Sequence, residues 1–319
     1  MAKSINVVVT CANRKTVTAR SQLELRTLPG TATAQRAERW IRRLSSANAN
    51  GAVTADTLYC GEHWSVVRSI PSVAKKAGRI TRMWICSAGY GLISSDSPVH
   101  PYNATFAAGD PNSVGNSSEG KNRERTIKQW WTKLTKWRGP GPEKIRSLAK
   151  LARTYPRDPL LVVASREYLL AVEDDLKEAA KELKNPNLLM VVSAGTRQLG
   201  SLSANLLPCD ARLQTCLGGA RVSLNARITR RLIGGTRVRS MNVSSAKRYL
   251  SELLRLQPAI VAPSRHPATD DQVVRFIKRE ITRRGITSRS KLLRMFRESG
   301  RACEQSRFAA LYATAVGRK

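Results

Sequence analysis

Four short apolar segments end in polar or reactive residues. They are residues 5–11, 82–89, 159–165 and 187–195. Continuous apolar runs bounded by Gly, Pro or Asn are typical of strands that are covered on both faces, and therefore of a largely parallel sheet. Parallel strands bring their carboxyl ends to one edge, where open α/β sheets bind ligands. We therefore expect a site at that edge. The residues at or just after the ends are Thr10, Cys11, Asn13, Arg14, Lys15, Ser87, Gly89, Tyr90, Ser165, Arg166, Ser193, Gly195, Thr196 and Arg197.

Cys11 is the strongest candidate nucleophile of this group. Arg14 and Lys15 follow it closely, and nearby cations favour the thiolate, which is the reactive form. The alternative is a small buried residue at a strand end, the commoner fate of a cysteine. The six cysteines include no C-x-x-C pair, and the three histidines show no zinc spacing. Motifs of P-loop proteins, dinucleotide enzymes, serine hydrolases and zincins are missing, so we expect no metal and no cofactor.

The charge of the chain indicates a polyanionic partner. Its 319 residues carry 55 Lys and Arg against 23 Asp and Glu, a net charge of +32 with a pI near 11.0. Residues 120–155, 211–250 and 270–319 hold most of this excess, which suits phosphate contacts along a nucleic acid. The composition excludes an acidic calcium buffer and a neutral enzyme that works alone on small neutral substrates. The plain alternative is a solvated basic surface.

A second candidate region covers residues 207–231. Gly218 and Gly219 permit close backbone approach, and the polar side chains around them offer planar donors and acceptors for a base edge or a phosphate. Between residues 211 and 250 no acidic residue balances the arginines. The alternative is a hairpin-like connection with solvated charges. The candidate DNA-binding residues are Asp210, Arg212, Asn225, Arg227, Arg230 and Arg231.

Helical patterns separate the apolar segments. Pro71 is expected to break or kink the second helix, and Ser245 is a plausible N-cap of the last. Trp130, Trp131 and Trp137 lie at helical spacing in the first basic region, where core packing is favoured over stacking on bases or a lipid interface. Residues 103–120 are rich in Gly, Asn and Ser and should form an exposed, mobile loop. The expected helices are 34–46, 63–77, 122–137, 142–154, 166–183 and 244–256.

The pattern predicts two structural parts. Residues 1–256 should form the α/β core with basic insertions, and residues 257–270 a Pro-rich linker. Residues 271–319 should form a basic helical domain of three short helices, either a nucleic-acid-binding module or a cap on the sheet. No run reaches the roughly 18 apolar residues of a membrane span, and the first residues lack a signal peptide, so we expect a cytoplasmic protein without a membrane partner.

Motifs in the first third of the chain resemble the YaaA-like superfamily. Its members show a Cys-x-x-Lys-like strand end, a Leu-Tyr-x-Gly turn, a Ser-Ala-Lys-Tyr-Gly-Leu turn and a following Pro-Tyr. Gly89 stands where many relatives have lysine, so the role of that lysine is lost or moved elsewhere. The matching residues are Val9-Thr10-Cys11-Ala12-Asn13-Arg14-Lys15, Leu58-Tyr59-Cys60-Gly61, Ile85-Cys86-Ser87-Ala88-Gly89-Tyr90-Gly91-Leu92-Ile93 and Pro101-Tyr102.

The longer layout, with residues 210–227 and 300–308, resembles the DpdC family of that superfamily. This family is associated with 7-deazaguanine modification of bacterial DNA. The resemblance implies a YaaA-like fold and an enzyme that hydrates the nitrile of 7-cyano-7-deazaguanine (preQ0) in DNA to the carboxamide. It also implies DNA carrying a 7-deazaguanine base as a partner, with other proteins of the modification system as further candidates, and no cofactor.

Two mechanisms for such a reaction fit the candidate residues. The Cys11 thiolate can add to the nitrile carbon to give a thioimidate, which water then opens. Alternatively, water attacks directly while donors such as Ser87 and Arg14 hold the nitrile. A general acid must protonate the nitrile nitrogen. The candidate acids are Lys15, Tyr90 and Tyr102. The other candidates for substrate contact at this edge are Asn13, Tyr59, Gly89 and Ser193.

Two other classes of function compete with this one. A non-catalytic, YaaA-like DNA-binding protein that recognises unusual DNA structures would need the basic surfaces but no reactive group. A nuclease or glycosylase is disfavoured because no carboxylate cluster suited to a metal is visible. The target nitrile lies in the major groove, so the enzyme can reach it in the duplex or flip the base out.

Overall fold

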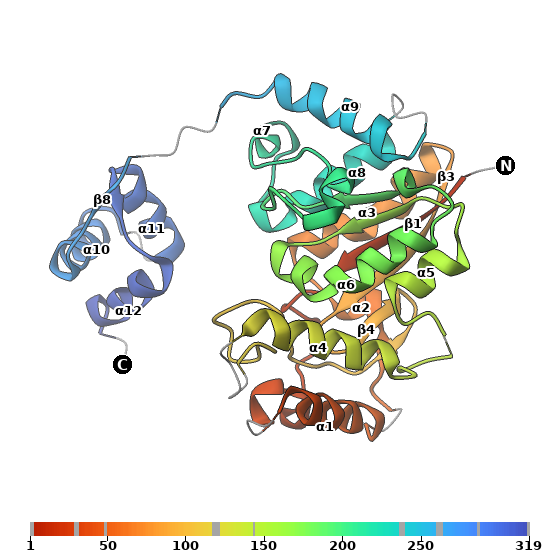
Figure 1. The fold of residues 1–319 in the computed structure, drawn as a ribbon. Coiled ribbons are helices and arrows are strands. Elements are labelled where there is room, and N and C mark those ends of the chain that lie inside the picture. The colour runs from red at the N-terminus through yellow and green to blue at the C-terminus, as the bar shows by residue number, and fades with distance from the viewer. Residues whose placement is uncertain are drawn as a thin grey trace. The chain divides into compact units, whose positions relative to one another are not determined.

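In the computed structural model, five strands form one mixed sheet with helices on both faces (Figure 1). The structure describes residues 3–28, 32–47, 50–116, 122–142, 144–235, 240–259, 264–285 and 288–317. The strand order is β4-β3-β1-β6-β7, in which only β4 is antiparallel to its neighbour. The expected α/β class with a largely parallel sheet is confirmed. The strands are β1 (Lys3–Thr10), β3 (Arg79–Ser87), β4 (Gly91–Ser94), β6 (Leu160–Val163) and β7 (Leu189–Val192).

The central strands are apolar because both of their faces are covered. Every residue of β6 and β7 is buried, and so are Ile5, Val7, Val8 and Val9 of β1. The polar exception in β1 is Asn6, whose Oδ1 accepts a hydrogen bond from Trp84 Nε1 at 3.3 Å. All four predicted strands are present, each within a few residues of its expected bounds.

The connections place helices on opposite faces of the sheet. The chain moves from β1 to β3 in one direction through α3 (Glu62–Lys76) and from β6 to β7 in the other through α6 (Arg166–Glu182). Because such crossovers are right-handed, the two helices cover opposite faces. Open α/β sheets with such a change of direction bind ligands at the carboxyl ends of the strands on either side of it. We call this region, at the carboxyl ends of β1 and β6, the crevice.

Each of these two helices has neighbours on its own face. On one face α8 (Leu224–Gly234) packs against α3, and on the other α6 packs against α4 (Arg123–Lys136) and α5 (Leu148–Thr154), with α1 (Thr33–Ser45) beyond α4 (Figure 1). The remaining elements of this part are η1 (Ser21–Leu23), η2 (Leu25–Thr27), β2 (Val53–Thr54), α2 (Ala55–Leu58), β5 (Pro98–Val99), η3 (Pro186–Leu188), η4 (Gly200–Asn205), α7 (Leu213–Leu217), η5 (Arg221–Ser223) and α9 (Val243–Arg255).

Side chains from distant elements hold the turn between β3 and β4. Trp40 Nε1 donates to Gly89 O and Trp130 Nε1 to Ala88 O, both at 2.8 Å. The guanidinium of Arg146, which is 7% exposed, donates to Leu92 O at 2.8 Å and also to Tyr90 O. Trp130 therefore belongs to the core and is positioned by a backbone carbonyl, as the preference for core packing predicted.

Three expectations about helices and their caps need correction. Helix α3 runs through Pro71 without a break, because Pro71 is exposed while the opposite face of the helix is buried. The helix expected from residue 142 begins at Leu148, where the side chain of Ser147 caps it. The N-cap of α9 is Asn242 and not Ser245, whose backbone N–H donates to Asn242 Oδ1.

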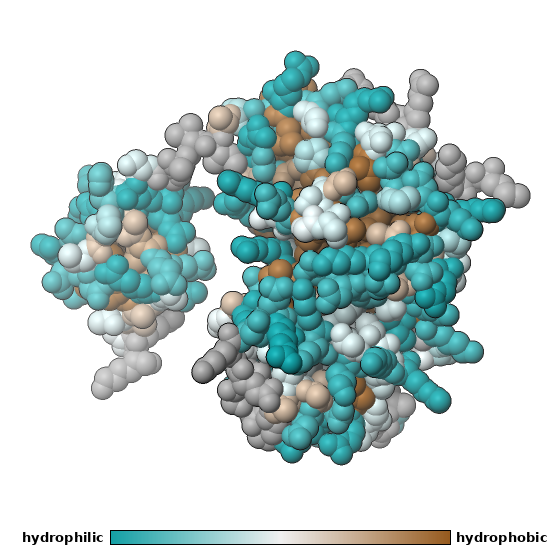
Figure 2. Space-filling view, in the orientation of Figure 1, coloured by the Kyte–Doolittle hydropathy of each residue, from teal (hydrophilic) through white to brown (hydrophobic). Residues whose placement is uncertain are grey.

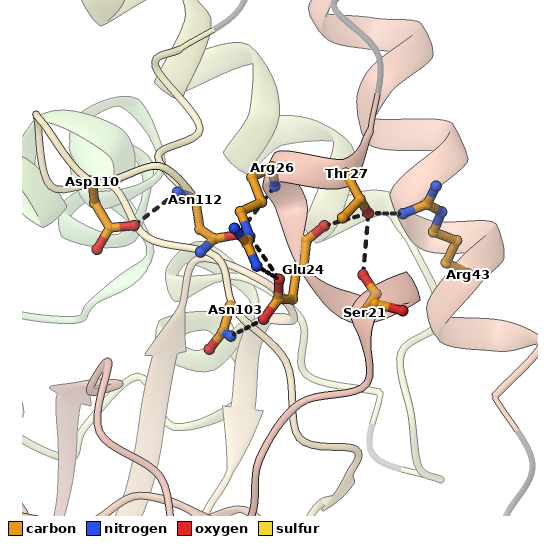
Figure 3. Close-up of polar contacts among 8 residues, drawn as sticks. All are labelled: Ser21, Glu24, Arg26, Thr27, Arg43, Asn103, Asp110 and Asn112. Atoms are coloured by element: carbon orange, nitrogen blue, oxygen red, sulfur yellow. Dashed lines mark hydrogen bonds and ion pairs between the residues drawn. The ribbon is translucent and has the colours of Figure 1, made fainter. Parts of the chain in front are cut away.

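The expected exposure of the loop over 103–120 is wrong for residues 103–116, and residues 117–121 lie outside the described part. Phe106 and Val114 are fully buried, and Arg36 Nη1 donates to Val114 O. Figure 3 shows how the loop is tied to η2: Glu24 accepts from Arg26 and from Asn103, while Arg26 N donates to the Asn112 side chain. Its Gly, Asn and Ser residues form tight turns over apolar anchors instead of a free loop.

Residues 259–319 form a second compact unit, and residues 1–258 the first. The second unit has its own apolar core, which includes Phe276, Phe296 and Phe308. The three helices expected here are confirmed, and a short parallel pair of strands joins their ends. The elements are β8 (His266–Pro267), α10 (Asp270–Arg284), α11 (Arg289–Glu298), β9 (Arg301–Ala302) and α12 (Gln305–Ala315).

The described surface is largely hydrophilic. On the face shown in Figure 2, hydrophilic residues cover most of the described surface. Large apolar side chains that are exposed are few among the described residues; they are Val17, Ile80, Val222 and Leu256. No helix in the described part of the chain is long and apolar enough to cross a membrane.

The substitution Arg146→Met should destabilise the first unit by on the order of 3 kcal/mol, because buried carbonyls lose their donor. Urea unfolding followed by tryptophan fluorescence measures this, since all six tryptophans lie within residues 1–258. Arg138→Met is the control, because Arg138 is exposed, and it should change the free energy of unfolding by less than about 0.5 kcal/mol. Equal effects of the two substitutions would contradict a structural role for Arg146.

Candidate active site

The crevice at the carboxyl edge of the sheet brings Cys11 and Tyr168 into contact. Cys11 directly follows β1, and Tyr168 lies in the first turn of α6, which follows β6. The Cys11 Sγ and the Tyr168 hydroxyl share a hydrogen bond of 3.0 Å, and each residue is 8% exposed. The contact thus joins the two sides of the crevice. Tyr168 was not among the predicted site residues.

Lys15 lies beside this contact in an unusual environment for an ammonium group. Its Nζ donates to the carbonyls of Ala12 (3.1 Å) and Asn13 (3.2 Å) and lies 4.7 Å from the centre of the Tyr102 ring. Burial lowers the pKa of Lys15, against the opposing influence of Cys11 and other nearby acidic groups. A lysine with a lowered pKa gives up its proton more readily, as a general acid must.

Ser87, Tyr59 and Tyr102 form a hydrogen-bonded network with no exposed atom. The Tyr102 hydroxyl bonds with Ser87 Oγ at 2.6 Å and with the Tyr59 hydroxyl at 3.0 Å. Ser87 Oγ also accepts from the backbone N–H groups of Gly89 and Tyr90. Burial raises the pKa of Tyr59 and of Tyr102 well above the usual value, so both phenols keep their protons at neutral pH.

The hydroxyl of Tyr90 also has a hydrogen-bond partner within the protein. It accepts a hydrogen bond of 2.9 Å from His100 N, and burial raises the pKa of Tyr90. Its ring packs edge-on against that of Tyr102, with 5.1 Å between centroids. Of the three candidate acids, Lys15 is therefore the one with a lowered pKa and partial exposure.

The ring of Tyr102 leaves no room for a side chain at residue 89. A Cβ atom at position 89 would lie 2.3 Å from Tyr102 Cε2, far closer than two carbon atoms can approach. With the Tyr102 ring in this position, no side chain fits at residue 89. The lysine of the YaaA-like motif is absent at residue 89, but Lys15, which follows β1, lies over the same Tyr102 ring.

The exposed rim of the crevice contains Asn13 and Arg14. Asn13 Nδ2 donates to Asp110 Oδ2 at 3.0 Å, and the second oxygen of Asp110 accepts from Asn112 N, as Figure 3 shows in part. Asp110 was not predicted because it lies in the loop expected to be free. Arg14 is exposed, so its guanidinium is available to a ligand.

His63, at the start of α3, is also near this edge. Its two ring nitrogens are shielded from solvent, and neither makes a hydrogen bond of normal geometry. Burial lowers the pKa of His63, while the nearby backbone of Thr10 and Val222 opposes that change. The ring is therefore predominantly neutral at pH 7.

Among the residues predicted near the ends of β6 and β7, Arg166 and Arg197 are exposed, whereas Ser193 and Asn225 are structural. Asn225 Oδ1 accepts from Ala194 N at 2.9 Å and Asn225 Nδ2 donates to Ala164 O at 3.1 Å, so this side chain joins the segments after both strands. Ser193 is buried and its hydroxyl bonds with Thr196 at 2.8 Å. These groups are satisfied within the protein.

The structure separates the residues of the second candidate region. Residues 207–231 form short helices and turns, not a hairpin. Asp210 and Arg212 bind each other, with 2.8 Å between Arg212 Nη2 and Asp210 Oδ2. Arg227 binds Glu62 of α3, also at 2.8 Å. Together with Arg227, Arg230 and Arg231 line a surface hollow of about 450 Å³. Arg237 and Arg239 lie outside the described residues.

The crevice thus combines a thiol, a lysine of lowered pKa and exposed polar groups at a parallel-sheet edge, a set suited to nucleophilic addition. In comparisons with family models and with curated proteins, nothing matches this chain.

Because Gly89 is closely packed, a substitution there should destabilise the protein more than the same substitution at an open glycine. Gly89→Ala should lower the free energy of unfolding by about 1–3 kcal/mol, because the new methyl group must displace the Tyr102 ring. Gly195→Ala is a matched control: it follows the same Ser-Ala pair after β7, and a Cβ there meets no atom within 4 Å. Urea unfolding measures both. Similar effects of the two substitutions would show that Tyr102 does not confine residue 89.

The ion pair of Glu62 predicts a pH-dependent stability. Hydrogen bonds from Arg227, Ala220 N and Ser223 lower the pKa of Glu62 to about 2. Its stabilising contribution is therefore complete above the unfolded pKa of about 4.3 and is lost as the pH falls towards 2. The stability difference between the natural protein and Glu62→Gln should be largest near neutral pH and shrink on acidification. Urea unfolding across this range measures it. Glu178→Gln, which removes an exposed carboxylate of α6, should show no comparable trend.

Proposed function

We propose that this protein acts on DNA and hydrates the nitrile of a 7-cyano-7-deazaguanine base to the carboxamide, with Cys11 as the nucleophile. The observation that carries the proposal is the placement of Cys11 beside Lys15 and Tyr168 in the crevice at the carboxyl edge of the sheet. The YaaA-like motif residues contribute most of that crevice, which supports a YaaA-like type of fold. The nitrile is the substrate that the family resemblance suggests.

The proposed reaction balances without a cofactor. The Cys11 sulfur forms a bond with the nitrile carbon, and the nitrile nitrogen takes a proton, which gives a thioimidate. Water then adds to the same carbon, and one of its protons goes to the nitrogen. The C–S bond breaks, the sulfur leaves as the thiolate, and the second proton of the water returns to the group that protonated the nitrile. The net change is the addition of one water to the nitrile.

In this proposal Lys15 supplies the proton for the nitrile nitrogen. Its lowered pKa assists the transfer, whereas Tyr59 and Tyr102 keep their protons in the buried network. We assign to Ser87, Tyr59 and Tyr102 the positioning of Lys15 and the β3–β4 turn, because their polar groups already bind one another. Tyr168 holds the sulfur of Cys11 in the crevice.

The basic surfaces supply the affinity for DNA in this proposal. Residues 120–155 and 211–250 each contribute a net charge of about +9, and the described lysines and arginines of these regions are largely at the surface. Such contacts are sequence-independent and weaken steeply with salt. Specificity for the modified base must then come from the crevice.

The reaction assay uses DNA that contains 7-cyano-7-deazaguanine, with mass spectrometry of the digested nucleosides. A gain of one water is expected, and Cys11→Ala should lower its rate on the order of a thousandfold or more. Cys86→Ala is the control: Cys86 lies in β3 beside Thr10 of β1, and burial raises the pKa of its thiol. That variant should retain the rate within about threefold. Product formation by Cys11→Ala at the full rate would exclude the thioimidate and leave direct attack by water.

A non-catalytic DNA-binding protein is the second candidate. The observation that favours it is that Ser87, Tyr59 and Tyr102 are fully buried and satisfied, so much of the predicted catalytic set is structural. Unchanged nucleosides in the same assay, together with tight and salt-sensitive binding of that DNA, would replace the enzyme by this alternative.

A further inference from the structure

A basic hollow lies between the end of α4 and the start of α5, outside the crevice that contains Cys11. It encloses about 650 Å³ and is lined by a tryptophan and several cations. The residues that matter here are Lys136, Trp137, Arg138, Lys144, Arg146 and Lys150. No acidic side chain lines it among the described residues, and the sequence between Lys136 and Lys150 contains one, Glu143, which the structure does not describe.

Four of the cations that line this hollow are exposed and have no ion pair among the described residues. They are Lys136, Arg138, Lys144 and Lys150. By contrast, Lys128 and Lys133 of α4 are bound to carboxylates, at 2.8 Å and 2.7 Å. Four exposed cations around one concave surface, without an ion pair in the described part of the chain, fit the phosphates of a nucleic acid.

Trp137 forms a rigid aromatic wall of the hollow. Arg146 Nε donates to Trp137 O at 3.2 Å, and the guanidinium lies 5.4 Å from the centre of the indole ring. The Tyr90 ring packs behind the indole at 5.9 Å. A fixed aromatic ring among cations is the arrangement by which proteins hold unpaired bases, since stacking supplies affinity and the cations follow the backbone.

The hollow is connected to the crevice by a row of rings. Trp137 packs on Tyr90, Tyr90 on Tyr102 at 5.1 Å, and Lys15 lies over Tyr102. Arg146 binds the carbonyl of Tyr90, in the turn that follows β3, and the carbonyl of Leu92, in β4. A strand bound in the hollow would therefore contact Trp137 and Arg146, both of which touch Tyr90 in the turn between β3 and β4.

We propose that this hollow is a binding subsite for single-stranded nucleic acid, in which Trp137 stacks on an unpaired base and Lys136, Arg138, Lys144 and Lys150 contact the phosphates. The inference rests on the proposed action on DNA and deepens it, because it assigns a place to the strand beside a displaced base. A single strand is favoured over a duplex because the indole can stack only on a base that is not paired.

The test measures binding of a fluorescently labelled single-stranded DNA of about 12 nucleotides by the full-length protein at several salt concentrations. The triple variant Lys136→Gln, Lys144→Gln, Lys150→Gln should bind at least about tenfold more weakly, and the slope of log affinity against log salt should fall by about 2. The matched control removes three exposed lysines elsewhere, Lys75→Gln, Lys76→Gln and Lys184→Gln. It should lose much less affinity.

The stacking of Trp137 on a base is tested with the substitutions Trp137→Leu and Trp137→Phe. The leucine variant should lose about tenfold in affinity with an unchanged salt slope, while the phenylalanine variant stays within about threefold. Trp137 is partly buried, so thermal unfolding of both variants is measured as well; if the leucine variant is unfolded, the phenylalanine variant and the exposed lysines decide the result.

The outcomes separate this subsite from the general proposal. If the natural protein binds no nucleic acid, the proposed function fails together with the subsite. If it binds, but the triple variant equals its control, only the subsite is wrong. A mononucleotide that displaces the oligonucleotide completely, or equal losses on a fully paired duplex, would show that the hollow does not recognise a single strand.

Discussion

The buried carbonyl groups of Ala88, Gly89, Tyr90 and Leu92 are the constraint on which the rest of the site depends. The chain must turn sharply between β3 and β4 inside the core, and a buried carbonyl without a donor costs about 1–3 kcal/mol. The donors come from far away in the sequence: Trp40 on α1, Trp130 on α4, and Arg146 before α5. By satisfying the turn, these side chains also fix the helices that carry them. The contacts among Trp137, Tyr90 and Tyr102, and the position of Lys15 over Tyr102, depend on the helices being held in this way.

The sequence predicted the fold well where one local pattern determines the structure. Continuous β-branched runs specified the four parallel strands, and amphipathic spacing specified the main helices, because burial on one or two faces leaves a direct periodic signal. Boundaries and caps were less predictable. The start of α5 depends on the Ser147 cap, and the loop containing Phe106 and Val114 looked polar in composition although its two apolar residues anchor it. Such anchoring depends on partners that are distant in the chain.

The position of several candidate residues at one edge of the sheet was predictable, but their hydrogen-bond partners were not. Cys11, Lys15 and Ser87 do meet at the carboxyl edge, because parallel strands must end there. Tyr168 was missed since 157 positions separate it from Cys11 and only the neighbouring strands bring them together. The sequence also could not show that Asp210 would neutralise Arg212, or Glu62 Arg227. Residue types indicate which bonds are possible, whereas the fold decides whether a side chain is already occupied.

The separate apolar core of the second unit has a consequence for how this chain can evolve. The two cores share no residue, so loss or exchange of residues 259–319 would leave the packing around the crevice intact. This unit carries an excess of nine positive charges. Recombination at the junction can therefore change the net charge of the chain in one step, while the residues of the first core stay the same.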